Sequence, residues 1–245
     1  MDKKKKNKSK DNKKENLYAV KQKEKENNIP DKLRIEIKLL SETIFGNGEN
    51  TSNSVDNEVL QDKLGIPYMK GKTFKGKLRE EAEAVANLLE DNNETGYVDA
   101  VNSMFGKEGE DKSLETLKFS NCEISENIRN ILLEEIENGN ITKEEITGAF
   151  TNVRNFTKIG HNGIAEEGSL RQTRVVKKNL KYYVDINCKR KLTSIEKGIL
   201  ACSIKALKNI GAMESRGKGQ VQCRLLNNNK DVTLDYIKNL EKVVK

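Results

Sequence analysis

The chain has 245 residues, a formal net charge of +7, 35% apolar residues and 34% charged residues, a composition typical of a soluble protein with an extensive polar surface. It has no run of about eighteen apolar residues, which excludes a transmembrane helix, and its lysine-rich start lacks the apolar segment of a secretory signal. Four widely spaced cysteines without a CxxC pair, and a single histidine, argue against a zinc site and predict reduced, mostly buried thiols in a cytoplasmic protein.

The chain begins with a lysine-rich tail, residues 1–28, which holds eleven lysines against five acidic residues. Its low apolar content predicts disorder. A solubilising role and a supporting contact to nucleic acid are both compatible with such a tail.

Strand and helix patterns follow in the first half of the body. Apolar residues alternate over residues 33–39, which predicts a half-buried strand. The stretch 41–59 is rich in Gly, Asn and Ser and predicts a loop. From Thr73 to about Glu90 the apolar residues fall on one helical face, and a second predicted helix over residues 98–104 ends near Gly106.

In the middle of the chain, residues 115–124 predict a strand with Leu117 and Phe119 inward. A helix is expected from Ser125 to Gly139. Residues 140–168 are mixed and contain glycine, and no single element is predicted there.

The last third returns to regular patterns. Alternation over residues 171–188 predicts a strand or a hairpin, and a helix is expected from Thr193 or Ser194 to a stop at Gly211. A final strand covers residues 219–226. With insertions removed, the order is β-α-β, a long insert, then β-α-β, which is typical of the α+β, ferredoxin-like (RRM-like) fold.

Charge is segregated within this body. Residues 80–145 carry a net charge of −13, residues 146–224 carry +11, and residues 67–79 add five basic residues without an acid. The two basic regions can form one cationic face, which suits a nucleic-acid phosphate backbone.

The first motif, KGKTFKGKLR, covers residues 70–79 at the start of the predicted helix. Gly71 and Gly76 let the backbone approach a ligand closely, and exposed N–H groups at a helix start attract anions. The polar side chains suit a repeating phosphodiester chain better than a single phosphate, and they are Lys70, Lys72, Thr73, Lys75, Lys77 and Arg79. A solvated basic helix start is the plainer alternative.

The second motif, NIGAMESRGKGQV, covers residues 209–221 between a predicted helix and a strand. Arg216 and Lys218 are interleaved with three glycines, Gly211, Gly217 and Gly219. A tight helix-to-strand connection would explain the glycines alone, so this motif is weak by itself.

Together the two motifs carry a family resemblance. IPYMKGKTFKGKLR resembles the lPyIPGSSLKGklR signature of the RAMP superfamily, the RNA-binding proteins of CRISPR–Cas type III effector complexes, and IGAMESRGKGQV is similar to that superfamily's C-terminal glycine-rich loop. SMFG…LKFSNCEI and GIAEEGSLRQTRVV resemble two further pieces, and the matches run in order from about residue 33 to 226. Lys70 replaces the usual proline and Lys72 a serine, which makes this loop more basic.

The stretch SVDNEVLQDKLGIPYMKGKTFKGKLR most resembles the multi-copy backbone subunit of these complexes, whose aspartate cuts guide-paired target RNA in a divalent-metal-dependent reaction. The resemblance implies Asp56 as the catalytic residue, Mg²⁺ as the cofactor, and the cations and glycines of both motifs as guide-RNA contacts. It further implies guide RNA, complementary target RNA, other effector subunits and further copies of this chain as partners, with no membrane.

General chemistry is compatible with this role for Asp56. RNA carries its own nucleophile, the 2′-OH, so cleavage mainly needs in-line geometry and charge management, and a carboxylate can assist proton transfer or hold a metal. Asp56 can instead be an Asx-type turn residue, with Glu58 and Asp62 as nearby alternatives; the metal ligands stay unknown. Two other functions remain open: a non-catalytic structural RNA-binding subunit, and a guide-processing nuclease that uses His161.

The expected organisation has three parts. Residues 1–28 form the basic tail, and residues 29–226 form a RAMP ferredoxin-like palm with inserts at about 80–168. Within those inserts we expect a helical, acidic part over roughly 80–145 and a thumb-like segment near 140–168. Residues 227–245 form a C-terminal helical extension.

Overall fold

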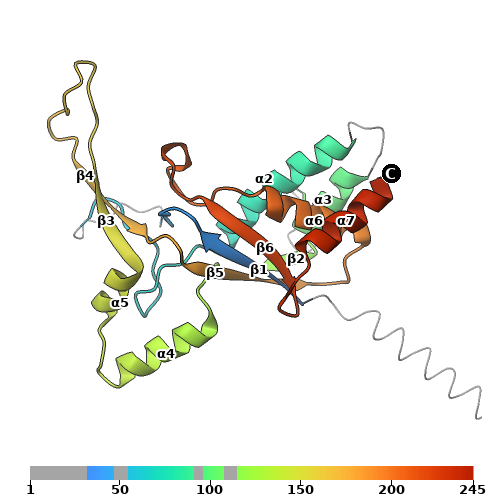
Figure 1. Ribbon diagram of the computed structural model, residues 1–245, viewed down its shortest axis with the longest axis horizontal. Helices are drawn as coiled ribbons and strands as arrows, with labels where there is room; N and C mark the ends of the chain where they lie inside the picture. The colour runs from blue at the N-terminus through green and yellow to red at the C-terminus, as the bar shows by residue number, and fades with distance from the viewer. Residues whose placement is uncertain (1–31, 47–54, 91–95, 108–114, 245) are drawn as a thin grey trace, which may run out of the picture.

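The computed structural model of the chain describes residues 32–46, 55–90, 96–107 and 115–244. Its main sheet is antiparallel and runs in the order β2-β5-β1-β6-β7 (Figure 1). The strands are β1 (Lys32–Leu39), β2 (Leu117–Phe119), β5 (Lys181–Cys188), β6 (Val221–Asn227) and β7 (Lys230–Asp231). Without the short edge strand β7, this is the strand order of a ferredoxin-like fold, and the predicted fold class is confirmed.

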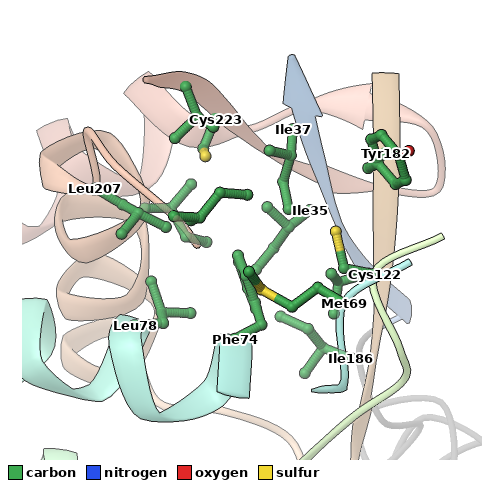
Figure 2. Close-up of a cluster of buried hydrophobic side chains, with 14 of the residues drawn as sticks. Ile35, Ile37, Met69, Phe74, Leu78, Cys122, Tyr182, Ile186, Leu207 and Cys223 are labelled. Atoms are coloured by element: carbon green, nitrogen blue, oxygen red, sulfur yellow. The ribbon is translucent and has the colours of Figure 1, made fainter. Parts of the chain in front are cut away.

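Helices α2 (Gly71–Glu90) and α6 (Ser194–Ala206) cover one face of this sheet. Every second residue of β1 is buried, as the alternation predicted, because a strand presents successive side chains to opposite faces. Figure 2 shows Phe74 and Leu78 of α2 in the same cluster as Ile35 and Ile37 of β1. Burial of these side chains removes apolar surface from water and holds α2, with its basic start, against the sheet.

The hairpin of β3 (Thr151–Phe156) and β4 (Arg171–Val176) forms a separate two-stranded sheet. It extends away from the palm in Figure 1. The prediction for residues 171–188 is therefore refined: the segment holds two strands, but β4 pairs with β3 while β5 joins the main sheet. The base of the hairpin is attached to the palm by a two-way backbone pairing of Thr43 with Val176.

Three further helices lie between these strands. The predicted helices over 98–104 and 125–139 are confirmed as α3 (Tyr97–Phe105) and α4 (Glu126–Glu137). The mixed segment contains α5 (Lys143–Phe150), whose start is fixed by reciprocal hydrogen bonds between Thr142 and Glu145. The structure therefore resolves residues 140–168 into a short helix, a strand and the hairpin loop.

The predicted stop of α6 at Gly211 is wrong. The helix starts as expected, with Thr193 as its N-cap, but it ends at Ala206. Leu207 and Ile210 are buried in the core, and the backbone of this segment pairs with residues 219–221 rather than continuing the helix. Burial and strand-like pairing of the segment outweigh the extra helical turn.

The chain closes with α7 (Thr233–Val244), which packs on α6 through Leu240 and Gly198.

The predicted tail, residues 1–28, lies outside the described residues. Within the described ranges no helix is both long and apolar enough to cross a membrane. Cys122, Cys188 and Cys223 are buried, as expected.

Candidate nucleic-acid interface

A groove of about 490 Å³ brings the two motifs together although they are far apart in sequence. One wall is the start of α2, which buries Phe74 and Leu78 and leaves Lys72 and Thr73 exposed. The other wall is the segment that follows α6. The groove is lined by Ile44, Phe45, Gly46, Met69, Lys70, Lys72, Thr73, Gly76, Lys77, Glu80, Ile210, Gly211, Ala212 and Glu214.

The cations of the first motif differ in what they contact. Lys70 and Lys72 are exposed on the groove and form no ion pair with a described residue. Lys77 also lines the groove, and its Nζ lies 3.3 Å from a carboxylate oxygen of Glu214, on the opposite wall. Burial opposes the charged form, but Glu214 and Glu80 together raise the pKa of Lys77 above its usual value.

Lys75 and Arg79, the remaining cations of this motif, do not line the groove. Lys75 forms an ion pair with Glu115, and both side chains are mostly covered. Arg79 Nε lies 2.6 Å from Glu83, one helical turn further along α2. Their charges are therefore balanced by neighbouring carboxylates before any ligand arrives.

The glycines divide into two kinds. A Cβ atom on Gly71 would lie 2.3 Å from the carbonyl oxygen of Ser120, and one on Gly219 would lie 2.0 Å from that of Ile210, so the chain's own backbone requires these glycines. Gly211 is similar, with the carbonyl oxygen of Ile44 at 2.5 Å. At Gly76 and Gly217 the Cβ would meet no described atom within 4 Å, so both glycines border open space.

The second motif contains a short 3-10 turn, Glu214–Arg216, between two residues with left-handed backbone, Met213 and Gly217. The side chain of Arg216 is exposed. Lys218 does not line the groove, and its Nζ lies 2.6 Å from Glu42. Residues 211–219 form the glycine-rich loop.

Asp56 lies at the hairpin, not in the groove lining. Its side chain is exposed, and Oδ2 accepts a hydrogen bond of 2.6 Å from the backbone N–H of Gln172 in β4. The next residue, Asn57, pairs with the backbone of β4 and donates its side-chain amide to Thr173 at 3.2 Å. Residues 56–57 thus add a short third segment to the hairpin, and Oδ1 of Asp56 forms no hydrogen bond with a described residue.

The two alternative carboxylates are engaged in the fold. Glu58 lies 2.7 Å from Arg174 of β4. Asp62 accepts backbone hydrogen bonds from Leu64 and Ile66 and forms an ion pair with Arg129 of α4 at 3.0 Å. Within the described residues no group of three or more His, Cys, Asp or Glu side chains could hold a metal ion.

His161, the only histidine, lies in the loop between β3 and β4 with its side chain exposed. The same loop carries exposed Ile159, Ile164 and Leu170. The structure thus gives His161 a solvated position away from the groove residues.

Sequence reasoning missed two carboxylates beside these cations. Glu214 was visible inside the second motif as the only acid among its glycines and cations. Glu42 follows β1 in the predicted loop and carried no signal, yet it is bound by Arg154 and Lys218. These hydrogen bonds lower the pKa of Glu42 to about 2 despite the cost of its partial burial.

Comparisons with known proteins agree with this architecture. The family model of the RAMP superfamily matches residues 36–222, which is more than half of the chain. A chain in the cryo-EM structure of Type III-B Cmr-beta bound to cognate target RNA is 12% identical with a TM-score of 0.56, and the match covers 84% of this chain and 98% of that one. A chain in the apo-state structure of Type III-B Cmr-beta is also 12% identical, with a TM-score of 0.57 and coverage of 80% and 97%. Among curated proteins no match was found.

Proposed function

This chain belongs to the RAMP superfamily, and we propose that it is the guide-RNA-binding backbone subunit of a type III CRISPR effector complex that cleaves guide-paired target RNA. The observation that carries the proposal is the groove, where the starts of α2 and of the glycine-rich loop face each other across open space. The similar fold of chains from two Type III-B Cmr-beta structures, one of Cmr-beta bound to cognate target RNA, supports the same assignment.

The groove suits the backbone of a single RNA strand. Lys70 and Lys72 supply charge on one wall, Lys77 is paired with Glu214 and Glu80, and Arg216 adds an exposed cation beside the other wall. Gly76 leaves room for close approach of a sugar-phosphate chain. Aromatic residues make up only 5% of the chain, which favours recognition of the backbone, with sequence read by base pairing to the guide.

Target cleavage is assigned to Asp56. Its exposed carboxylate is oriented by the backbone N–H of Gln172, which leaves the second oxygen available to a substrate. That oxygen can accept the proton of an attacking 2′-OH. A nearby carboxylate, Glu58, is held by Arg174 and does not compete for this role.

A divalent cation such as Mg²⁺ fits this site only if groups other than Asp56 supply most of its ligands. Among the described residues only Gln172 hydrogen-bonds the Asp56 carboxylate, and no cluster of three or more His, Cys, Asp or Glu side chains there adds further ligands. Substrate phosphates and water would have to complete the coordination, as is common for Mg²⁺. When bound, the cation would stabilise the charge that develops on the phosphate.

The assignment implies an assembly in the cytoplasm with guide RNA, target RNA, other effector subunits and further copies of this chain. A specific observation keeps a non-catalytic RNA-binding subunit as the alternative. The hydrogen bond from Gln172 to Asp56 would also be made by a carboxylate whose only role is to fasten residues 56–57 to β4.

The deciding experiment is cleavage of a guide-complementary RNA by the co-purified complex, with the wild-type chain compared with Asp56→Ala and Asp56→Asn. We expect regularly spaced cuts in the wild type and a fall in rate of about 100-fold or more in both variants, with guide binding unchanged. Asp235→Ala, which removes an exposed carboxylate at the start of α7, is the control and should cut normally. Equal cutting by wild type and Asp56 variants would move catalysis elsewhere, and guide binding without cutting would favour the structural subunit.

A further inference from the structure

Glu42 lies three residues after the end of β1, at the junction of the palm, the glycine-rich loop and the β3–β4 hairpin. Its side chain is 13% exposed. Arg154 of β3 donates from Nη2 and Nε to Oε1 at 2.6 and 3.0 Å, and Lys218 of the glycine-rich loop donates to Oε2 at 2.6 Å. Asn152, also in β3, adds a contact of 3.3 Å to Oε1. Arg154 Nε also reaches Oε2 at 3.2 Å, so one carboxylate binds both the hairpin and the loop, with Oε2 shared between them.

The ion pairs at Glu42 involve two cations and only one carboxylate. Two cations from separate parts of the fold converge on one carboxylate. If the carboxylate were removed, Arg154 and Lys218 would face each other with like charge, so attraction between hairpin and loop would become repulsion. The carboxylate therefore adds an attraction between hairpin and loop that its removal would turn into a repulsion.

The backbone around Glu42 makes the same connection. The carbonyl oxygen of Glu42 accepts a hydrogen bond of 2.8 Å from Gly219 in the loop. Its neighbour Thr43 exchanges hydrogen bonds of 3.1 and 2.7 Å with Val176 at the end of β4. Residues 42–43 are therefore joined to the groove side through the loop and to the hairpin side through β4.

Strand β4 also holds Asp56, through the backbone N–H of Gln172. A continuous set of contacts thus leads from the loop, through Glu42, to the hairpin and Asp56. We propose that Glu42 is a positioning residue that fixes the β3–β4 hairpin, and with it Asp56, relative to the glycine-rich loop, and so determines where target RNA is cut relative to the guide. The positional part of this inference rests on the function proposed above.

The test compares Glu42→Ala and Glu42→Asp with Glu115→Ala in the co-purified complex. Glu115 is a suitable control because its carboxylate is similarly covered, at 17% exposed, but pairs with Lys75 of α2 and has no contact with the hairpin among the described residues. We expect Glu42→Ala to lower cutting at the wild-type positions by about tenfold or more, with new cuts at adjacent phosphodiesters and guide affinity within about threefold of wild type. Glu42→Asp should restore much of the wild-type pattern.

Glu115→Ala should leave the cut positions unchanged. If Glu42→Ala lowers cutting only in proportion to the amount of guide-bound complex, with every cut in its wild-type position, the positioning role is wrong.

A second readout separates this inference from the proposed nuclease. Hydrogen exchange of the purified full-length chain follows the amides of residues 171–176 and 211–219 without any need for cleavage. Faster exchange in both segments of Glu42→Ala, but not of Glu115→Ala, is the expected result even if the wild-type complex does not cut RNA. Unchanged exchange in both segments would overturn the connection itself, whatever the cleavage assay gives.

Discussion

The groove and the hairpin differ in how much of the chain holds them in place. Around the groove, glycines fit against backbone from distant segments, and Lys77 is paired with a carboxylate on the opposite wall. The hairpin is attached mainly at its base, and its loop exposes Ile159, Ile164 and Leu170 at 58%, 66% and 63%. The groove is therefore a preformed surface, whereas Asp56 and Asn57 are held by hydrogen bonds to one strand of the hairpin, β4.

The largest expected effect is on stability and compares two glycines of the glycine-rich loop, one closely packed and one bordering open space. Gly219→Ala should destabilise the chain by about 3 kcal/mol or more, because its Cβ would lie 2.0 Å from a carbonyl oxygen and φ is +77°. Gly217→Ala has a similar φ of +72° but borders open space, so we expect only about 1–2 kcal/mol. Urea unfolding of the full chain measures both. Equal losses would mean that backbone strain alone, and not close packing, requires glycine at 219.

The next effect distinguishes cations that are available to a ligand from those already neutralised. Lys72→Ala should weaken RNA binding roughly threefold to fivefold, on the order of 1 kcal/mol, and lower the slope of log K against log salt by about 0.7, the value for one phosphate contact on a single strand. Lys75→Ala removes the same charge from the same helix, but from an ion pair with Glu115. It should lower stability and leave the salt slope unchanged.

Titration of RNA at several salt concentrations with both variants makes this measurement. If Lys75→Ala reduces the slope as much as Lys72→Ala, the ion pair with Glu115 opens on binding and the whole motif contacts RNA. That result would return Lys75 to the role its sequence motif suggested.

Local patterns explain what could be predicted from the sequence. The strand β1 and the apolar face of α2 depend on residues within a few positions of each other, so periodicity identified them. The end of α6 could not be predicted from Gly211. This glycine has a left-handed backbone and packs closely against Ile44, so it does not mark the end of the helix. Charge counts likewise identified a basic motif but not its pairing, since Lys75 meets a carboxylate 40 positions away.

Glu42 is the clearest case of information that lies outside local sequence. Its partners Arg154 and Lys218 are 112 and 176 positions further along the chain. No spacing rule connects residues so far apart, and only the assembled fold brings them together. The same holds for Asp56 and Gln172, which are 116 positions apart. The resemblance identified Asp56 as a candidate, and the fold adds which strand holds it.

The smallest expected effect concerns the hairpin base and its dependence on pH. In the folded chain the pKa of Glu42 is lowered to about 2 by Arg154 and Lys218, below its ordinary value of 4.5. Because the unfolded chain takes up the proton first as pH falls, the contribution of Glu42 to stability is fully present above pH 4.5 and is lost between 4.5 and about 2. The stability difference between wild type and Glu42→Gln should therefore be largest at about pH 6 and clearly smaller at about pH 3. Urea midpoints of both proteins at the two pH values measure this, and a difference that does not change with pH would mean that neutral packing, and not the ionised carboxylate, holds the hairpin to the loop.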